Sequence, residues 1–394
     1  VVKVIKGRKP NIVSSFKNEE TPHSYVTIEA FEFGEAVQFA SQEKNSIFTN
    51  EGDILMVWDG ARFGMVGKSI GGILGSTLAC LKPSRVLNKN YLHYFLLSKN
   101  QYLRSNQRGA GIPHLDSHLV KKLPIPLPAL SEQRRIVEIL DQADEIRKLR
   151  KQADEKAEKI IPALFYEMFG DPVTYKGKLT IRDVVKKVEQ KDFRKFPDHK
   201  FKYIDISSVD GNKGKIVFFT DYIGSNAPSR AKQIVKYNDV LISTVRPYLR
   251  ATALVPEELD QQVCSTGFCA LRTKKEFGFG FLYALSRLKW FSNILMSVAR
   301  GASYPAVSEN DILNLKIPYP NQNDILIKKF DDMIINLERE SEHREKSSER
   351  INNLFELLIS KAFGGSLTAS WREANMKELL QEMEEQKKYL EKVN

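Results

Sequence analysis

Two kinds of hydrophobic pattern alternate along this chain, and they predict two kinds of structure. Short apolar runs bounded by glycine and asparagine, such as residues 53–58 and 240–245, have the length of β-strands. After each strand-rich region comes a long stretch in which apolar residues recur every three and four positions, as they do in amphipathic helices. The pattern therefore predicts an α+β chain in which strand-rich regions are followed by long charged helices.

The whole arrangement occurs twice, at a spacing of roughly 190 residues, which suits duplicated domains and is too long for a solenoid repeat. The matching segments, in order, are 1–3 with 184–186, 53–55 with 239–241, 76–77 with 265–266, 91–92 with 281–282, 108–113 with 300–305, 123–128 with 315–320, and Phe169-Gly170 with Phe363-Gly364. Chance does not readily produce seven matches in one order. We therefore predict two domains of the same fold.

Both long helices carry a heptad pattern, which predicts that they pack together as a coiled coil. The predicted seam consists of Ile136, Ile139, Ile146, Ala153, Ile160 and Leu164 in the first helix, and of Ile327, Phe330, Ile334, Leu337, Ile351, Phe355 and Leu358 in the second. Since each helix returns the chain to a globular region, an antiparallel pair with one domain at each end is the simplest arrangement.

The ends of the first helix can be read from single residues. Ser131 is expected to cap its start, Gly170 to end it, and Pro162 to kink or break it near Ile161. A helix of about 39 residues is roughly 58 Å long, and one turn of B-DNA is about 34 Å. Two domains at the ends of such a rod are therefore suited to DNA segments one turn or more apart. The alternative is that the long helices serve only to hold a dimer together.

These patterns predict two duplicated mixed α/β domains separated by the coiled coil. The predicted divisions are 1–128 for the first domain, 129–170 for the central helix, 171–320 for the second domain, 321–364 for the distal helix and 365–394 for a helical tail. The tail places Met376, Leu379 and Leu380 near one helical face, so we expect it to pack on its own domain or on a partner.

Net charge and cysteine content indicate the kind of partner and the redox compartment. The chain carries 60 Lys and Arg against 49 Asp and Glu, a net charge of +11, which favours a polyanionic partner without choosing between DNA, RNA and an acidic protein. Its three cysteines imply no disulfide framework and favour a reducing cytoplasm. No apolar run approaches the roughly 20 residues that a membrane helix needs.

Each candidate motif for catalysis or metal binding in this sequence lacks required residues. Gly67-Lys68-Ser69 lacks the earlier glycine of a P-loop, and residues 277–280 resemble a methyl-donor loop in a chain without an Asn-Pro-Pro or Asp-Pro-Pro tetrad. The pairs His114 with His118 and Cys264 with Cys269 have no nearby partners to complete a zinc site. We therefore expect no metal, no cofactor and no catalysis in this chain.

At this point a resemblance is visible. Residues 123–141, LPIPLPALSEQRRIVEILD, resemble the signature of specificity subunits of type I restriction-modification enzymes, in which a target-recognition domain ends and a conserved helix begins. Residues 165–172 and 357–367 resemble the ends of the central and distal helices of that family. The second copy departs from the signature, with Asn323-Asp324-Ile325 where the first has Ser131-Glu132-Gln133.

The resemblance implies a subunit that recognises double-stranded DNA in the cytoplasm and has no catalytic role. Each target-recognition domain would read one half of a split DNA site, and the helical spacer would set the gap of unread bases. The partners would be two methyltransferase subunits, which bind S-adenosylmethionine, and motor-nuclease subunits. Two alternatives stay open: a self-contained DNA adenine methyltransferase or nuclease, and a coiled-coil adaptor without affinity for DNA.

Arginine and lysine on turn-rich segments are the candidates for DNA contact, because side chains reach base edges while basic groups bind phosphates. In the first domain they are Arg62, Lys68, Arg104 and Arg108, and in the second Lys213, Lys215, Arg230, Lys232, Arg246, Arg250, Arg300 and Tyr304. Most single members of such a set are solvated surface charges, so the prediction concerns the set.

Overall fold

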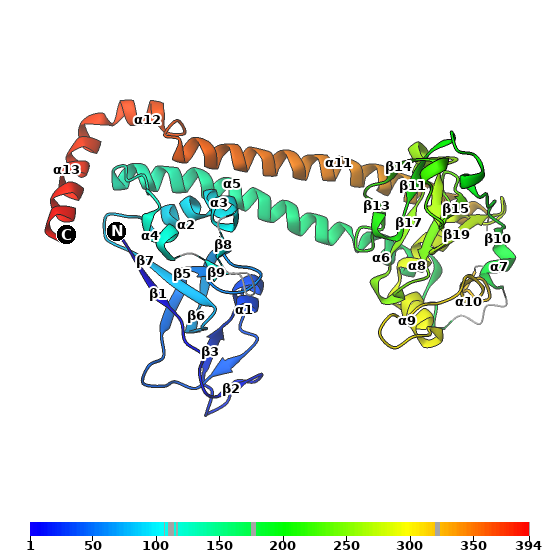
Figure 1. Ribbon diagram of the computed structural model, residues 1–394, viewed down its shortest axis with the longest axis horizontal. Helices are drawn as coiled ribbons and strands as arrows, with labels where there is room; N and C mark the ends of the chain where they lie inside the picture. Colours follow the sequence, from blue (N-terminus) through cyan, green and yellow to red (C-terminus); the bar gives the residue numbers. More distant parts are fainter. Residues whose placement is uncertain (106, 109–113, 116, 175–178, 320–323, 394) are drawn as a thin grey trace. The chain divides into compact units, whose positions relative to one another are not determined.

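The computed structural model describes residues 1–105, 107–108, 114–115, 117–174, 179–319 and 324–393 (Figure 1). It divides into two compact units, Val1–Leu149 with Ser347–Asn394, and Arg150–Lys346. Five residues of the predicted repeat motifs and of the second helix start lie outside the described residues: Gly109, Ala110, Pro113, Pro320 and Asn323.

The first unit is built on a seven-stranded mixed sheet with strand order β1-β7-β5-β6-β3-β4-β2. Its strands are β1 (Val2–Lys6), β2 (Val13–Ser14), β3 (His23–Val26), β4 (Phe39–Ala40), β5 (Phe48–Val57), β6 (Val66–Leu74) and β7 (Leu78–Pro83), with a separate hairpin of β8 (Gln107–Arg108) and β9 (His114–Leu115). Its helices are α1 (Ile28–Phe33), α2 (Lys89–Ser98), α3 (Asn100–Ser105), α4 (Ser117–Lys122) and most of α5 (Leu130–Ala157).

Side chains alternate between the two faces of β5, and each face is buried. Ile54 and Met56 pack in a cluster with α2, whereas Leu55 and Val57 pack in a second cluster with Val26 of β3. Successive residues of a strand point to opposite faces, so an uninterrupted apolar run predicts a strand covered on both sides. The run of residues 53–58 is such a strand.

The second unit contains two four-stranded sheets, with orders β10-β19-β16-β17 and β14-β11-β18-β15, and a β12-β13 hairpin. Its strands are β10 (Val185–Lys186), β11 (Lys200–Ile204), β12 (Val209–Asp210), β13 (Lys215–Ile216), β14 (Thr220–Ile223), β15 (Ala231–Ile234), β16 (Val240–Ser243), β17 (Thr252–Leu254), β18 (Val263–Ser265) and β19 (Phe268–Thr273). Its helices are α6 (Ile160–Phe169), α7 (Ile181–Val184), α8 (Phe279–Arg287), α9 (Lys289–Val298), α10 (Glu309–Leu313) and the first part of α11 (Asp324–Phe363).

Strand register confirms the duplication. Val2-Lys3 of β1 pair with Pro83 and Lys82 of β7, and Val185-Lys186 of β10 pair with Thr273 and Arg272 of β19. The next pairing is repeated as well, since Ile54 lies opposite Leu81 and Val240 lies opposite Leu271. A register slip of one residue would turn every side chain to the wrong face, so equal registers indicate equal cores. The predicted α+β class with two mixed domains and two long helices is therefore confirmed.

The phenylalanine that ends each copy packs on the same helix of a domain. Phe363, at the end of α11, contacts Tyr91 of α2 with ring centroids 5.2 Å apart. Phe169, at the end of α6, contacts Phe281 of α8 at 5.0 Å. Tyr91 and Phe281 are repeat mates, so the Phe-Gly end of the first copy packs in the second unit and that of the second copy packs in the first unit.

The central helix differs from its prediction at its start, whereas its predicted end is confirmed, because α6 ends at Phe169 and Gly170 follows as the C-cap. It is interrupted at residues 158–159, and Pro162 lies in the first turn of α6, where its missing N–H is tolerated. The predicted break is thus confirmed, a few residues before Ile161. Ser131 as the cap is wrong, because α5 begins at Leu130; the Ser131 N–H instead donates to the Glu382 carboxylate at 2.9 Å.

The strict heptad seam is only partly correct. The buried seam residues are Ile136, Ile327, Phe330, Ile334 and Phe355, and the half-buried ones are Ile139, Leu164, Leu337, Ile351 and Leu358. Ile146, Ala153 and Ile160 are exposed, which corrects their assignment to a continuous buried seam. The reason is that the helix ends pack on globular cores, so Val137 and Leu140 join Ile136 on a wider buried face.

Within the first unit the two long helices run antiparallel. Arg147 of α5 donates to Asn352 of α11 at 3.1 Å and its guanidinium lies 4.1 Å from the Phe355 ring centroid. Fifteen residues earlier in α5, Glu132 meets Thr368, which follows α11. Residue numbers thus rise along one helix while they fall along the other. Pairing along the full length of both helices stays a prediction.

The tail forms α12 (Ala369–Ala374) and α13 (Met376–Val393), and both pack on the first unit, beside the start of α5 (Figure 1). Leu379 is buried, and Gln386 donates to the carbonyls of Val86 and Pro128 at 3.3 and 3.2 Å. The expectation that the tail packs on its own domain is confirmed. Met376 and Leu380 remain exposed, so only part of the predicted apolar face is used.

Candidate nucleic-acid interface

The most informative loops follow matching strands in the two units. In the first, residues 58–65 join β5 to β6, and in the second, residues 244–251 join β16 to β17. Both begin with the same contact, Trp58 N–H to the Thr77 carbonyl at 2.8 Å and Thr244 N–H to the Gly267 carbonyl at 2.9 Å. We call them the first loop and the second loop.

The two loops also share their backbone conformation. Gly60 and Gly64 have positive φ in the first loop, and Arg246 and Arg250 have φ of 50° at the matching positions of the second. Inside each loop the same turn closes, Phe63 N–H to the Gly60 carbonyl at 3.0 Å and Leu249 N–H to the Arg246 carbonyl at 2.9 Å.

Glycine adopts this left-handed conformation freely, whereas a non-glycine residue pays on the order of 1–3 kcal/mol. The second loop therefore carries arginine twice where its repeat mate carries glycine. Strained residues of this kind concentrate at functional sites. The strain points to a use for both side chains.

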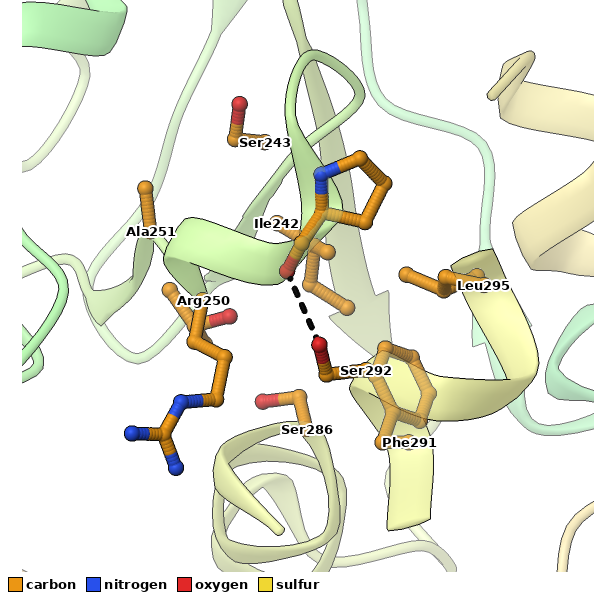
Figure 2. Close-up of a pocket in the computed structure, with 10 residues that line it drawn as sticks. Ile242, Ser243, Arg250, Ala251, Ser286, Phe291, Ser292 and Leu295 are labelled. Carbon is orange, nitrogen blue, oxygen red and sulfur yellow. Dashed lines mark hydrogen bonds between the residues drawn. The ribbon is translucent and has the colours of Figure 1, made fainter. Parts of the chain in front are cut away.

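The second loop is held in place by a contact with α9. Its Pro247 is buried, and the Ser292 hydroxyl of α9 donates to the Pro247 carbonyl at 3.1 Å, the dashed line in Figure 2. The pocket drawn there encloses about 10 Å³, room for at most one water, so it serves packing and not ligand binding. Figure 2 shows the guanidinium of Arg250 directed away from Phe291 and Leu295. A firmly supported loop thus extends basic side chains outward.

Arg246 lines an open hollow of about 620 Å³ together with Asp205, Asn212, Leu249 and Tyr304. Its guanidinium carbon lies 4.7 Å from the Tyr304 ring centroid, and the backbone N–H of Arg246 donates to the Pro305 carbonyl at 2.7 Å. Tyr304 is 66% exposed. The structure thus brings together Arg246 and Tyr304, which the sequence placed 58 residues apart.

In the first unit, three of the predicted residues lie in the first loop, beside it, or on β6, which follows it. Arg62, in the first loop, forms an ion pair with Glu32 of α1, and its side chain is 47% exposed. Arg104 of α3 lies beside the loop, since a Cβ on Gly64 would be 3.3 Å from its Cγ. Lys68 is exposed on β6. Of Arg108 the structure gives only the backbone, in β8 opposite His114.

The remaining predicted residues of the second unit have other surroundings. Arg300 pairs with Asp311 at 3.1 Å while its side chain stays 73% exposed. Arg230 is exposed and Lys232 is half-buried in β15. These three stay predictions.

The two lysines of the β12–β13 hairpin face a helix. Lys213 reaches Glu345 of α11 at 3.3 Å, and Lys215 lies 3.9 Å from Glu338 and 3.8 Å from Glu345. The Lys215 side chain is only 14% exposed. Its charge is thus used to brace the hairpin on α11, and we leave Lys215 out of the candidate interface.

Two features of the loops were not predicted from the sequence. Tyr248 and Leu249 are 49% and 53% exposed at the tip of the second loop, where an apolar side chain can touch a base or a thymine methyl group. Glu32 is the partner of Arg62. The tripeptide Pro-Tyr-Leu between the two arginines of 246-RPYLR-250 was the only available signal for the first; the second depends on a contact across 30 residues.

The buried thiols match their predicted packing role. Cys264 and Cys269 are buried, and burial raises the pKa of both thiols, so neither is a reactive thiolate. Among the residues that the structure describes, no cluster of three or more His, Cys, Asp or Glu is arranged to hold a metal ion. Within the same residues, no helix has the length and apolar character required to cross a membrane.

Comparison with known proteins gives a consistent result. The family model of the type I restriction modification DNA specificity domain matches residues 1–159. The chain is 28% identical over 386 residues to the specificity subunit of the type I restriction enzyme MjaVIII from Methanocaldococcus jannaschii, covering 90% of this chain and 89% of that protein. With the EcoDI specificity subunit of Escherichia coli it shares 20% identity over 332 residues, covering 74% and 72%.

A solved structure has the same fold. The S subunit of a type I restriction-modification system from M. genitalium aligns with a TM-score of 0.53 over 92% of this chain and 93% of that one, at 16% identity. The chain is thus similar to type I restriction enzyme specificity subunits over most of its length, and its first 159 residues match the DNA specificity domain of such enzymes.

Proposed function

We propose that this chain is the specificity subunit of a type I restriction-modification complex and that it reads a split DNA site, one half with each unit, through the first and second loops. The observation that carries the proposal is the repeated loop, which has the same anchoring, the same backbone conformation and basic side chains in both units. A duplicated reader with a net charge of +11 fits a duplex, because counterion release from phosphates supplies affinity while loop side chains read base edges.

The proposal includes a fixed gap between the half-sites. The two long helices would pair antiparallel along their length and hold the domains at a set spacing. Support comes from the first unit, where α5 and α11 are antiparallel and joined through Arg147, Asn352 and Phe355. A stiff helical connection sets a distance, whereas a flexible linker does not.

Catalysis would come from partner subunits. We propose that two methyltransferase subunits, each with S-adenosylmethionine, bind the helices, and that motor-nuclease subunits join the complete complex. On the parts of the two long helices that belong to the first unit, four large apolar side chains are exposed: Ile146 and Leu149 on α5, and Leu354 and Leu357 on α11, at 54%, 54%, 54% and 50%. Each pair is spaced by three residues and so shares a helical face, as a protein interface requires.

Methylation mapping tests the reading function. DNA from a host that carries this chain with its methyltransferase subunits is expected to be methylated at one split motif with a constant gap. A continuous motif, or a gap that varies from site to site, would contradict two readers on a rigid spacer.

A charge-insertion pair tests the docking surface. Ile146→Asp with Leu149→Asp is expected to abolish co-purification of the methyltransferase subunit while the chain stays folded, because both side chains are already in solvent. Lys151→Asp is the matched control, since its side chain is 80% exposed on the same helix. Loss of the partner in the control alone, or retention in the double variant, would contradict the assignment.

A further inference from the structure

We propose that each loop presents one arginine to a guanine, Arg62 in the first unit and Arg246 in the second, and that Glu32 and Tyr304 are the residues that position them. The inference rests on the proposed function and adds the chemistry of the target: each half-site contains a G·C pair that a single arginine reads. Guanine offers two acceptors, N7 and O6, at the spacing of a guanidinium fork.

Arg246 is stacked and strained at the same time. The Arg246 guanidinium carbon lies over the Tyr304 ring, 4.7 Å from its centroid, so a cation–π contact holds the side chain without a charged acceptor. The backbone keeps a φ of 50° where the first loop has Gly60. A glycine at this position would serve the loop equally well, so the arginine is retained for its side chain.

Arg62 is held by a carboxylate in place of a ring. Glu32 accepts from Nη1 of Arg62, and a guanidinium has five N–H donors, so the opposite edge with Nε and Nη2 can meet a base. The ion pair lies at the surface, with 47% of the Arg62 side chain exposed. Pairing to one carboxylate limits the rotamers of a long side chain and reduces the entropy lost on binding.

Lys68 and Arg250 lack such an arrangement. Lys68 has no planar fork and binds an anion as a point charge. Arg250 shares the left-handed conformation, but its exposed guanidinium makes no ion pair or ring contact with the residues that the structure describes. These residues are better suited to phosphates, whose contacts add affinity without choosing a sequence.

The experiment measures base preference one position at a time. The chain in complex with its methyltransferase subunits is allowed to select from a randomised duplex library, and the selected sites are read for the parent, Arg62→Lys and Arg246→Lys. Lysine keeps the charge and removes the fork. Each variant is expected to lose, by about tenfold or more, the preference for one G·C pair in one half-site and to keep the preferences of the other half.

Arg246→Gly separates recognition from structure. Glycine relieves the left-handed strain, so the variant is expected to be at least as resistant to urea as the parent while it loses the same G·C preference. Lys68→Ala is the matched control and should weaken binding to all sequences alike. For the positioning role, Tyr304→Phe keeps a ring and should retain the preference, whereas Tyr304→Leu and Glu32→Ala should each reduce it.

Three results would overturn the inference. They are a parent half-site without a G·C pair, unchanged base preferences in both lysine variants, and loss of preference in Lys68→Ala at a single position. A parent complex that selects no sequence, or selects one continuous motif, would refute the proposed function as well, so the two failures are distinguishable.

Discussion

Glu132 and Arg372 lie 240 residues apart in sequence and form a buried ion pair. One carboxylate oxygen of Glu132 accepts from Nε of Arg372 at 2.8 Å and from Nη2 at 2.6 Å, and also from the Thr368 hydroxyl at 2.6 Å. The Glu132 side chain is 4% exposed and that of Arg372 is 34% exposed. The pair joins the first turn of α5 to the tail.

Removal of Arg372 should therefore loosen the start of α5. Arg372→Ala leaves the Glu132 carboxylate buried with Thr368 alone, and we expect a cost of about 2–3 kcal/mol, below the value for a fully buried pair because Arg372 is partly solvated. Hydrogen exchange in the first turns of α5 measures it. Glu132→Gln combined with Arg372→Ala should recover part of the loss; a double variant as unstable as the single one would contradict this account.

Two glutamines donate to the same pair of carbonyls and should differ in importance. Gln133 donates to Val86 and Pro128 at 3.0 and 2.8 Å and accepts from the Asn88 N–H at 2.8 Å. Gln386 donates to the same carbonyls at 3.3 and 3.2 Å, and its own carbonyl oxygen is buried without a described partner.

Leucine at either position tests this difference. Gln133→Leu leaves the Asn88 N–H without its acceptor and should cost about 2 kcal/mol, whereas Gln386→Leu also removes an unsatisfied oxygen and should cost under about 1 kcal/mol. Urea unfolding of the two variants under one set of conditions gives the comparison. Equal losses in the two variants would contradict the predicted difference between the two amides.

An aspartate that occurs at the same position of both repeats should contribute more to stability in the second unit than in the first. Asp239 accepts from the Lys236 N–H and from two nitrogen atoms of Arg272, with a side chain 2% exposed. Its repeat mate Asp53 accepts from the Asn50 N–H but lies 3.8 Å from Lys82, whose side chain is 44% exposed.

Substitution by alanine should reveal the difference. Asp239→Ala is expected to cost about 3–5 kcal/mol, because it leaves a largely buried guanidinium unpaired, and Asp53→Ala about 1 kcal/mol. Hydrogen exchange in β16 and in β5 reports each unit separately. A larger effect at β5 than at β16 would refute the ranking.

Asp331 of α11 makes the second unit sensitive to pH. Burial raises the pKa of Asp331 to about 6, although its carboxylate accepts from the Gly280 N–H at 2.8 Å. A carboxyl group whose pKa is higher in the folded state than in the unfolded state stabilises the fold when protonated, and that contribution is lost as pH rises from about 4 through 6.

Asp331→Asn should remove this dependence. The variant keeps an oxygen for Gly280, so at pH 7 it is expected to be more stable than the parent by on the order of 1 kcal/mol, with the difference vanishing below about pH 4. Thermal unfolding across pH 4–8 checks it, with exposed Asp198→Asn as the control. A difference that is constant over this range would exclude titration of Asp331 as the cause.

Local pattern was sufficient for much of this protein. The apolar run at 53–58 is β5, Pro162 separates two helices, and the register of Ile54 with Leu81 recurs at Val240 with Leu271, as the repeat required. These features depend on residues close in sequence, or on a comparison of the chain with itself. The heptad assignment failed at Ile146 because periodicity reports an apolar face without saying what covers it.

The contacts within the candidate interface could not be predicted from the sequence. Sequence named Arg62, Arg246 and Tyr304 as basic or aromatic residues on turns, but not that Glu32 holds the first or that the third stacks on the second. Nor did it distinguish Lys215, enclosed by two carboxylates of α11, from lysines that face solvent.

The amino-acid sequence by itself thus determined the duplication, the α+β class, the two long helices and the resemblance to type I specificity subunits, because each depends on residue spacing and short motifs. Tertiary structure decided which apolar helix faces are covered, where the tail packs, and which arginines are strained, stacked or paired. The physical reason is that burial and electrostatic pairing are properties of groups brought together from distant parts of the chain, and only the folded backbone sets those distances.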